Sequence, residues 1–409
     1  MASARVRPAG IEDLGLTRAE FRVLARLNTP QKIQDYLSAI PQNFEVGGQT
    51  CLSVRGVLRE RRAMCIEGAM VAACALWVNG EPPLLFDLKA RGDYDHVIAV
   101  YRRGRCWGAI SKTNSPVLRS DGRFAIYQSM GIPLYVEGAS QTAELKARGV
   151  FFTSFEHMPM WIESVWQDDD GTVYGWYHHE KWLCQNKLAS PVIGALVSRD
   201  GGKTFDDLGI VLESGYANDC SARNGFFAGG HGDFSVLLDQ SRQYFYFYFS
   251  NYSGPASTQG VAVARMAFSA RTRPAGRVFK YFQGSWSEPG IRGRVSAILP
   301  ATVNWSREDT DSFWGPSLHW NTYLQRYVML LNRACCGPGW PSGGTYVSFN
   351  PDLSAPTVWS VPEKILDADK SRWYPQVVGR PPNGTDRQAG REARFYMSGE
   401  SEYEIVFEY

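Results

Sequence analysis

The feature that most constrains the fold is a series of short aromatic hairpins in the C-terminal two-thirds of the chain. From about residue 121, helical periodicity fades, and runs rich in Tyr, Phe, Trp and Val alternate with Gly, Asp, Asn and Pro turns. We expect four strand–turn–strand units, which begin at Trp161, Phe234, Pro316 and Pro375. A further strand follows each of the first three, so the pattern is a loose repeat with long insertions.

Repeated hairpins of this kind are typical of four-stranded blades arranged around an axis. The sequence therefore predicts a mainly β fold, a five-bladed β-propeller over residues 121–409, with 121–156 supplying the fifth blade. Six blades, or a two-sheet sandwich, remain alternatives. The 409 residues also leave room for a second domain.

The N-terminal part has a different pattern, which predicts a small α+β unit over residues 21–119. Thr29 and Pro30 favour a helix start, and further helices are expected over 53–61 and 65–78. Strands are expected at 84–88, 96–101 and 107–111. Residues 1–20 are predicted to form a flexible leader.

The most specific local motif is Ser198-Arg199-Asp200-Gly201-Gly202-Lys203-Thr204-Phe205, which matches the Asp-box pattern Ser-X-Asp-X-Gly-X-Thr-aromatic. In this pattern the Ser and Asp side chains bind turn amides, glycine accepts a positive φ, and the aromatic ring fills the blade. The motif indicates a propeller hairpin, and we expect it to be structural rather than catalytic.

Two strand openings resemble those of five-bladed glycoside-hydrolase propellers of the arabinanase, xylosidase and invertase kind. The segment 232–236, Gly-Asp-Phe-Ser-Val, resembles their Asp-Pro-Ser-Val opening. The segment 314–317, Trp-Gly-Pro-Ser, resembles their Glu-Gly-Pro opening, with Trp314 where the acid should stand. The resemblance implies paired catalytic carboxylates and makes Asp233 the candidate base or nucleophile, although the position of the usual acid is lost.

Glycoside hydrolysis needs a second carboxyl group about 5–10 Å from the first. Glu163 and Glu180 are the candidates for the acid, and a surface or structural carboxylate is the alternative for each. Other residues suit a sugar cleft, because aromatic faces stack on sugars and polar groups bind their hydroxyls. These candidate substrate-binding residues are His179, His231, Trp314, Trp373 and Tyr374, and packing between blades is the alternative.

No metal or other cofactor is expected. Neighbouring strand residues point to opposite faces, so His178 and His179 cannot easily share one ion. The chain also has no glycine-rich phosphate loop between a strand and a helix.

The N-terminal unit resembles the transglutaminase-like, papain-type core, in which a cysteine at a helix start precedes a strand-borne histidine. This resemblance implies Cys65 as nucleophile and His96 as base, with Ser111 at the position of the third member. The alternative is a buried cysteine and a structural histidine.

The charge, the apolar runs and the cysteines limit which partners and which cellular compartment can be expected. A formal net charge of +2 gives no reason to expect nucleic acid as a partner. No apolar run is long enough for a membrane span and no signal peptide is seen, so a cytoplasmic protein is expected. Eight cysteines form no CxxC pair, and the adjacent Cys335 and Cys336 are poorly placed for an ordinary disulfide.

Three functions remain open from the sequence. The favoured one is a propeller that hydrolyses a poly- or oligosaccharide. The alternatives are a sugar-binding propeller without turnover, and a thiol hydrolase or transferase with the propeller as targeting module. The sequence does not define the oligomeric state.

Overall fold

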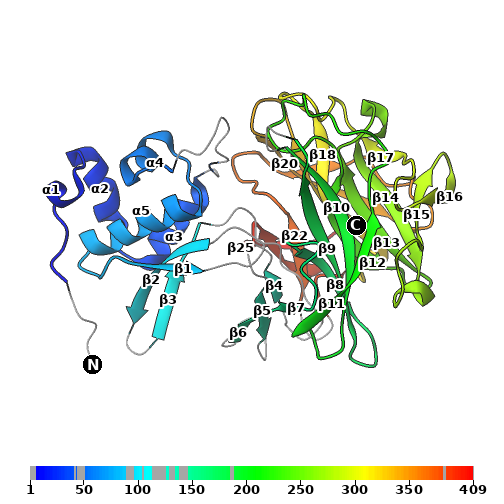
Figure 1. Ribbon diagram of the computed structural model, residues 1–409, viewed down its shortest axis with the longest axis horizontal. Helices are drawn as coiled ribbons and strands as arrows, with labels where there is room; N and C mark the ends of the chain where they lie inside the picture. Colours follow the sequence, from blue (N-terminus) through cyan, green and yellow to red (C-terminus); the bar gives the residue numbers. More distant parts are fainter. Residues whose placement is uncertain are drawn as a thin grey trace. The chain divides into compact units, whose positions relative to one another are not determined.

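The computed structural model divides the chain into two compact units, residues 1–114 and 115–409 (Figure 1). It describes residues 6–40, 43, 51–88, 96–103, 106–112, 126–128, 134–137, 146–184, 188–380 and 384–408. Among these residues, no helix is long and apolar enough to cross a membrane.

The first unit combines five helices with a small antiparallel sheet. The helices are α1 (Ile11–Leu14), α2 (Arg18–Arg26), α3 (Pro30–Ala39), α4 (Val54–Glu60) and α5 (Cys65–Val78). The sheet has the order β1 (Leu84–Leu88), β2 (His96–Arg103), β3 (Cys106–Ile110). The predicted helix starts are confirmed, since the Thr29 side chain caps α3 and the Ser53 side chain caps α4.

The predicted flexible leader is wrong for the part that the structure describes. Residues 11–14 are helical and α2 already begins at Arg18. Ala9 and Leu16 are buried in the core of this unit, so their apolar side chains tie the segment to the helices that follow. The Thr17-X-X-Glu20 capping box and the apolar face of α2 could have located this helix from the sequence.

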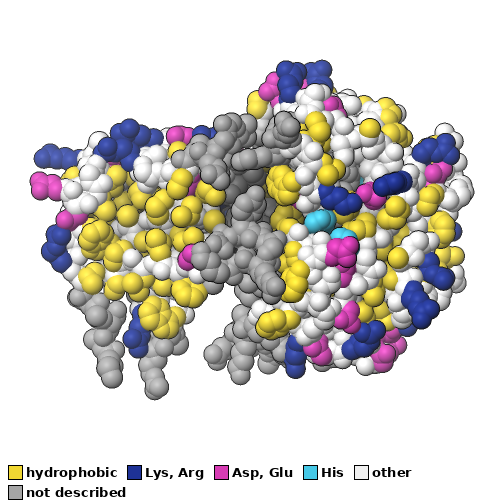
Figure 2. All heavy atoms as spheres, in the orientation of Figure 1, with side chains coloured by type: hydrophobic (Ala, Val, Ile, Leu, Met, Phe, Trp, Pro, Cys, Tyr) yellow, Lys and Arg dark blue, Asp and Glu magenta, His cyan; other side chains and the backbone are white. Residues whose placement is uncertain are grey.

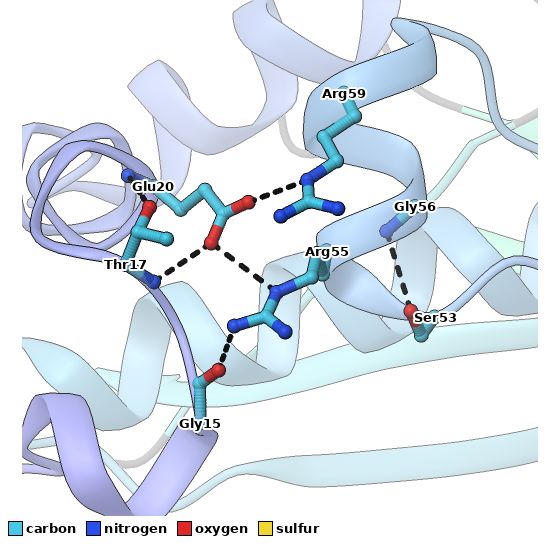
Figure 3. A network of polar contacts seen from close by, with 7 residues as sticks. All are labelled: Gly15, Thr17, Glu20, Ser53, Arg55, Gly56 and Arg59. Carbon is cyan, nitrogen blue, oxygen red and sulfur yellow. Dashed lines mark hydrogen bonds and ion pairs between the residues drawn. The ribbon is translucent and has the colours of Figure 1, made fainter.

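A carboxylate network joins α2 to α4 (Figure 3). Glu20 Oε2 accepts a hydrogen bond of 2.7 Å from the backbone N–H of Thr17, which completes a capping box at the start of α2. The same carboxylate pairs with Arg59 Nε at 2.8 Å and Arg55 Nε at 3.3 Å. These contacts, the Thr17 amide first, lower the pKa of Glu20 to about 2.

We expect Glu20→Gln to loosen the α2–α4 contact. The folded pKa of Glu20 lies below its ordinary 4.5, so its contribution is present above pH 4.5 and is lost as the pH falls towards 2. Hydrogen–deuterium exchange of residues 11–26 and 54–60 should therefore be faster in the variant at pH 7, with the difference shrinking in acid. Glu60→Gln is the control, because Glu60 pairs with Arg62 at the surface. Equal exchange in both variants would contradict the assigned role.

The second unit contains five antiparallel-rich sheets. The strands of the first two are β4 (Ile126–Gln128), β5 (Leu134–Glu137), β6 (Lys146–Gly149), and then β7 (Phe151–Phe152), β8 (Trp161–Gln167), β9 (Val173–Trp182), β10 (Ala189–Ser198) and β11 (Thr204–Leu212). The third has β12 (His231–Leu238), β13 (Tyr244–Asn251), β14 (Gly260–Ala267), β15 (Val278–Phe282), β16 (Ser285–Pro289) and β17 (Ala297–Pro300). The fourth has β18 (Ser312–Asn321), β19 (Arg326–Ala334), β20 (Ser342–Asn350), β21 (Glu363–Leu366) and β23 (Gln388–Ala389), and the fifth has β22 (Gln376–Gly379), β24 (Glu392–Met397) and β25 (Glu400–Val406).

Among the described residues, the second to fifth sheets pack face to face in succession. Trp176 of β9 meets Phe245 and Phe247 of β13, which fills the space between the second and third sheets. Separate apolar clusters join the third sheet to the fourth and the fourth to the fifth. A two-sheet sandwich has one such interface, so this alternative is wrong and the fold is a mainly β propeller with five sheets.

The Asp-box forms the turn that the sequence predicts. Asp200 Oδ1 accepts hydrogen bonds from the amides of Lys203 and Thr204 at 3.0 and 2.9 Å. Gly201 and Gly202 have φ values of 75° and 83°, and the Phe205 ring is fully buried. All of these contacts belong to the turn, which supports a structural role for the motif.

Candidate functional site

One strand in each of three consecutive sheets has the same irregularity. The pairing of β8 with β9 shifts at Glu163, that of β12 with β13 shifts at Asp233, and that of β18 with β19 shifts at Gly315 and Pro316. A β-bulge leaves its extra residue outside the ladder and redirects the side chain. These bulges turn Glu163 and Asp233 into a common pocket, whose other walls include Gly315, Pro316 and Tyr374.

The Glu163 carboxylate is buried beside an imidazole. Its Oε2 accepts a hydrogen bond of 2.8 Å from the Phe234 amide, and its Oε1 lies 3.2 Å from His178 Nδ1. His178 Nδ1 also lies 3.3 Å from the backbone nitrogen of Asp233, and a protonated Nδ1 donates to the carboxylate. Gly232 permits this approach, because a Cβ there would lie 2.6 Å from the His178 ring.

Asp233 accepts hydrogen bonds from two tyrosine hydroxyls. Tyr374 donates to its Oδ1 at 2.7 Å and Tyr252 donates to its Oδ2. Asp233 and Tyr374 both have left-handed backbone, with φ values of 43° and 57°. Non-glycine residues adopt this conformation at some cost, so the surrounding packing must hold both residues in place.

The surroundings of the cluster shift the pKa of each of its groups. Burial raises the pKa of Asp233 to about 6; the His178 charge opposes this shift and the Glu163 charge reinforces it. Burial alone would lower the pKa of His178, but its contacts with Glu163 and Glu180 outweigh burial and hold that pKa well above the ordinary range. Burial and the Asp233 charge raise the pKa of Tyr252 and of Tyr374, so both phenols remain donors.

The pocket is small. It has a volume of about 10 Å³, roughly the space of one water molecule. One ligand atom is offered by each of Glu163, His178 and Asp233, and these three atoms lie within 4.8 Å of one another. Such a spacing could hold a metal ion. The carboxylate oxygens of Glu163 and Asp233 already accept the hydrogen bonds described above. His178 Nε2, in contrast, is buried without a hydrogen-bond partner among the described residues, 3.6 Å from Glu180 Oε1.

The structure separates the five predicted sugar-binding residues. Tyr374 lines the pocket. Trp314 is 2% exposed and packs against Trp340 and Trp373, so a sugar cannot stack on it. His231 is also buried, with Nδ1 beside the Gly230 carbonyl and its ring on Phe249. For Trp314 and His231, packing between blades, the alternative considered above, applies.

Two further sequence candidates, Glu180 and His179, lie on β9. Glu180 Oε1 is 3.6 Å from His178 Nε2, which places Glu180 at the edge of the cluster. His179 points to the opposite face, where its Nδ1 lies 3.2 Å from the Pro159 carbonyl and its ring contacts His157. The predicted separation of His178 and His179 is therefore confirmed.

Sequence reasoning missed Tyr252 as a site residue and gave His178 no site role. Tyr252 directly follows β13, and the pairing of His231 with Asn251 brings it level with the opening of β12. The register of that hairpin could have located Tyr252, since the strand pairing fixes which residues meet. His178 faces the same way as Glu180, two residues on, and the alternation of β9 could have grouped them.

The cysteines behave differently from the prediction. Cys184 bonds to Cys220 and Cys335 bonds to Cys336. In the first unit, Cys65 is the first residue of α5 and is partly exposed. Ser111 exchanges hydrogen bonds with Gln34 through its backbone. The side chain of His96 lies outside the described residues, so the pairing of Cys65 with His96 stays a prediction.

Comparisons with known proteins find similarity to solved structures alone. No protein family profile and no curated protein matches the chain. Solved structures with similarity include an exo-1,5-α-L-arabinanase from a bovine ruminal metagenomic library (14% identity, TM-score 0.41, covering 71% of this chain and 90% of that one). An endo-arabinase from Bacteroides thetaiotaomicron has 13% identity and a TM-score of 0.42, covering 71% and 92%. A thermostable family-43 glycoside hydrolase has 12% identity and a TM-score of 0.40, covering 71% and 86%. None of these findings supports a transglutaminase-like first unit.

The tyrosine contacts of Asp233 give a prediction for Tyr374→Phe. Loss of a donor to a carboxylate disfavours the charged form, so the apparent pKa of Asp233 should rise by about one pH unit or more. Carboxyl carbon NMR of aspartate-labelled protein measures this directly. Tyr281→Phe, in β15 of the third sheet, is the matched control. An unchanged Asp233 titration in Tyr374→Phe would show that the hydroxyl does not govern the charge.

Proposed function

We propose that the propeller is a glycoside hydrolase that acts on an oligo- or polysaccharide through Glu163 and Asp233. The observation that carries the proposal is the convergence of these two carboxyl groups, from different sheets, on one pocket. Hydrolysis of a glycosidic bond needs one carboxyl that holds a proton and one that is ionised. The raised pKa of Asp233 meets the first requirement, whereas the sequence alone suggested Asp233 as base or nucleophile and a glutamate as acid.

In this proposal Asp233 donates its proton to the leaving oxygen as the glycosidic bond breaks. Glu163 attacks the sugar carbon and forms a glycosyl ester. Asp233, now ionised, removes a proton from water, and the resulting attack releases the sugar and restores both carboxyl groups. The Glu163 and Asp233 oxygens lie within 4.8 Å, which fits such a double displacement better than the wider spacing of inverting enzymes.

The size and charge of the site limit how a sugar can bind. A pocket of about 10 Å³ admits a single oxygen-sized group, so the ring itself lies at the mouth. Hydrogen bonds from the hydroxyls of Tyr252 and Tyr374 hold Asp233 in place. On the face that Figure 2 shows, basic and acidic side chains are interspersed among the residues that the structure describes.

Removal of either carboxyl group should abolish turnover. We expect Glu163→Gln and Asp233→Asn each to reduce reducing-sugar release from a panel of plant and microbial polysaccharides by about 10³-fold or more, as expected when an essential catalytic group is lost. Activity should fall as the pH rises above 6, where Asp233 loses its proton. Glu392→Gln, an exposed carboxylate in β24, is the control. Release that survives both site substitutions would refute the proposed roles.

The stereochemistry of the product gives an independent check. Double displacement predicts retention of the anomeric configuration, which proton NMR of the first product resolves. Inversion would mean that a water molecule separates the reacting carboxyl groups. In that case a more distant partner, such as Glu180, would replace one member of the pair.

A sugar-binding propeller without turnover is the second candidate. It is favoured by the third opening, where Trp314, Gly315 and Pro316 supply no carboxylate. Binding to members of the panel, with no release of reducing sugar at any pH tested, would decide for this function.

A further inference from the structure

One face of β9 leads from the buried cluster to the surface. The pairing of β9 with β10 is continuous from Val173 to Trp182. Because side chains alternate along an uninterrupted strand, His178, Glu180 and Trp182 lie on the same face. The exposed fraction rises along this face: it is 3% for the His178 side chain, 16% for the Glu180 side chain and 52% for the whole Trp182 residue.

Two observations indicate that this face borders the pocket. Glu180 Oε1 lies 3.6 Å from His178 Nε2, and His178 contacts Glu163. The Glu180 charge also contributes, after burial and the charges of Asp233 and Glu163, to the raised pKa of Tyr374. Trp182 is the next residue of the same face, about 7 Å further along the strand than Glu180.

Trp182 is unusual among the tryptophans of the second unit. Of those that the structure describes between residues 115 and 409, it is the only exposed one, and the others are buried or half-buried. Leu183 beside it is 58% exposed. A single exposed aromatic residue is ordinary on a protein surface. Trp182 differs in its position beside the pocket and in the attachment of its strand end to a neighbouring loop.

The strand end that bears Trp182 is fixed to the loop that leads into β12. Cys184 is bonded to Cys220, with their Cα atoms 5.6 Å apart. Ala189, which pairs with Trp182, exchanges backbone hydrogen bonds with Phe226 and Ala228 of that loop at 2.9 and 2.8 Å. An aromatic ring held this way loses little conformational entropy when a ligand binds.

We infer that Trp182 is a stacking platform for a sugar unit further along the chain from the one at the Glu163–Asp233 pocket, with Glu180 between them as an acceptor for sugar hydroxyls. This inference rests on the proposed carbohydrate function. Trp182 lies about 13 Å along the strand from His178, so the ligand must be a chain of sugars rather than a single ring. Glu163 and Glu180 bring two negative charges against the one positive charge of His178, so a neutral chain is the substrate class that this face favours over uronic acids.

The experiment compares Trp182→Ala with a matched control in the full-length protein. Both carry Asp233→Asn, so that ligands are not consumed. Phe151→Ala is the control, since Phe151 is 71% exposed and lies at the Asp-box end of the same sheet. Calorimetry measures binding of xylo-, arabino- and gluco-oligosaccharide ladders from the disaccharide upward, with oligogalacturonate as the acidic probe.

With the Trp182 side chain present, affinity for one neutral ladder should rise with chain length. Trp182→Ala should remove this rise and weaken the longest ligand about tenfold, whereas Trp182→Phe should retain most of it. Thermal unfolding checks that each variant is folded. Equal affinity in Trp182→Ala and Phe151→Ala, with a ladder that still binds, would overturn the platform and leave the carbohydrate function standing. Absence of binding to every ladder, together with absence of hydrolysis by the protein with Asp233 intact, would overturn both.

Discussion

The imidazole of His178 allows two acidic side chains to share the interior of the propeller. Glu163 and Asp233 are 5% and 4% exposed, and two unpaired carboxylates in such a place would repel each other and lose their hydration. His178 contacts Glu163, and its positive charge also acts on Asp233. The cluster is therefore a buried set of mutually dependent charges, and the state of each group depends on the others.

The backbone explains why these side chains meet. In strands with regular pairing, the side chains of Glu163 and Asp233 would point toward the faces of their sheets, where the neighbouring sheets pack. The bulges at both residues instead remove them from the alternation, and the left-handed conformation of Asp233 fixes its direction. The bulge at Gly315 also lines the pocket, but it contributes backbone atoms and no charged side chain. The site thus depends on irregular pairing at equivalent places in successive sheets.

These features mark the limit of sequence reasoning. The α5 bounds, the strand pairs and the Asp-box turn follow local rules of periodicity, capping and turn chemistry, and all were predicted. The grouping of Glu163 with Asp233 depends on pairing between distant segments, which no local pattern fixes. Tyr252 and the Cys184–Cys220 bond were missed for the same reason, since register and connectivity are properties of the folded chain.

The aromatic residue at the third opening affects the chemistry of the first two. Trp314 packs edge-on against Tyr374, which donates a hydrogen bond to Asp233. Tyr252, the second donor to Asp233, is held in the same aromatic cluster by Phe227 and Trp305. This packing keeps water away from Asp233, and burial is the main cause of its raised pKa. In the proposed reaction, this aromatic packing therefore helps to supply the acid, because a dry aspartate keeps the proton that a wet one would lose.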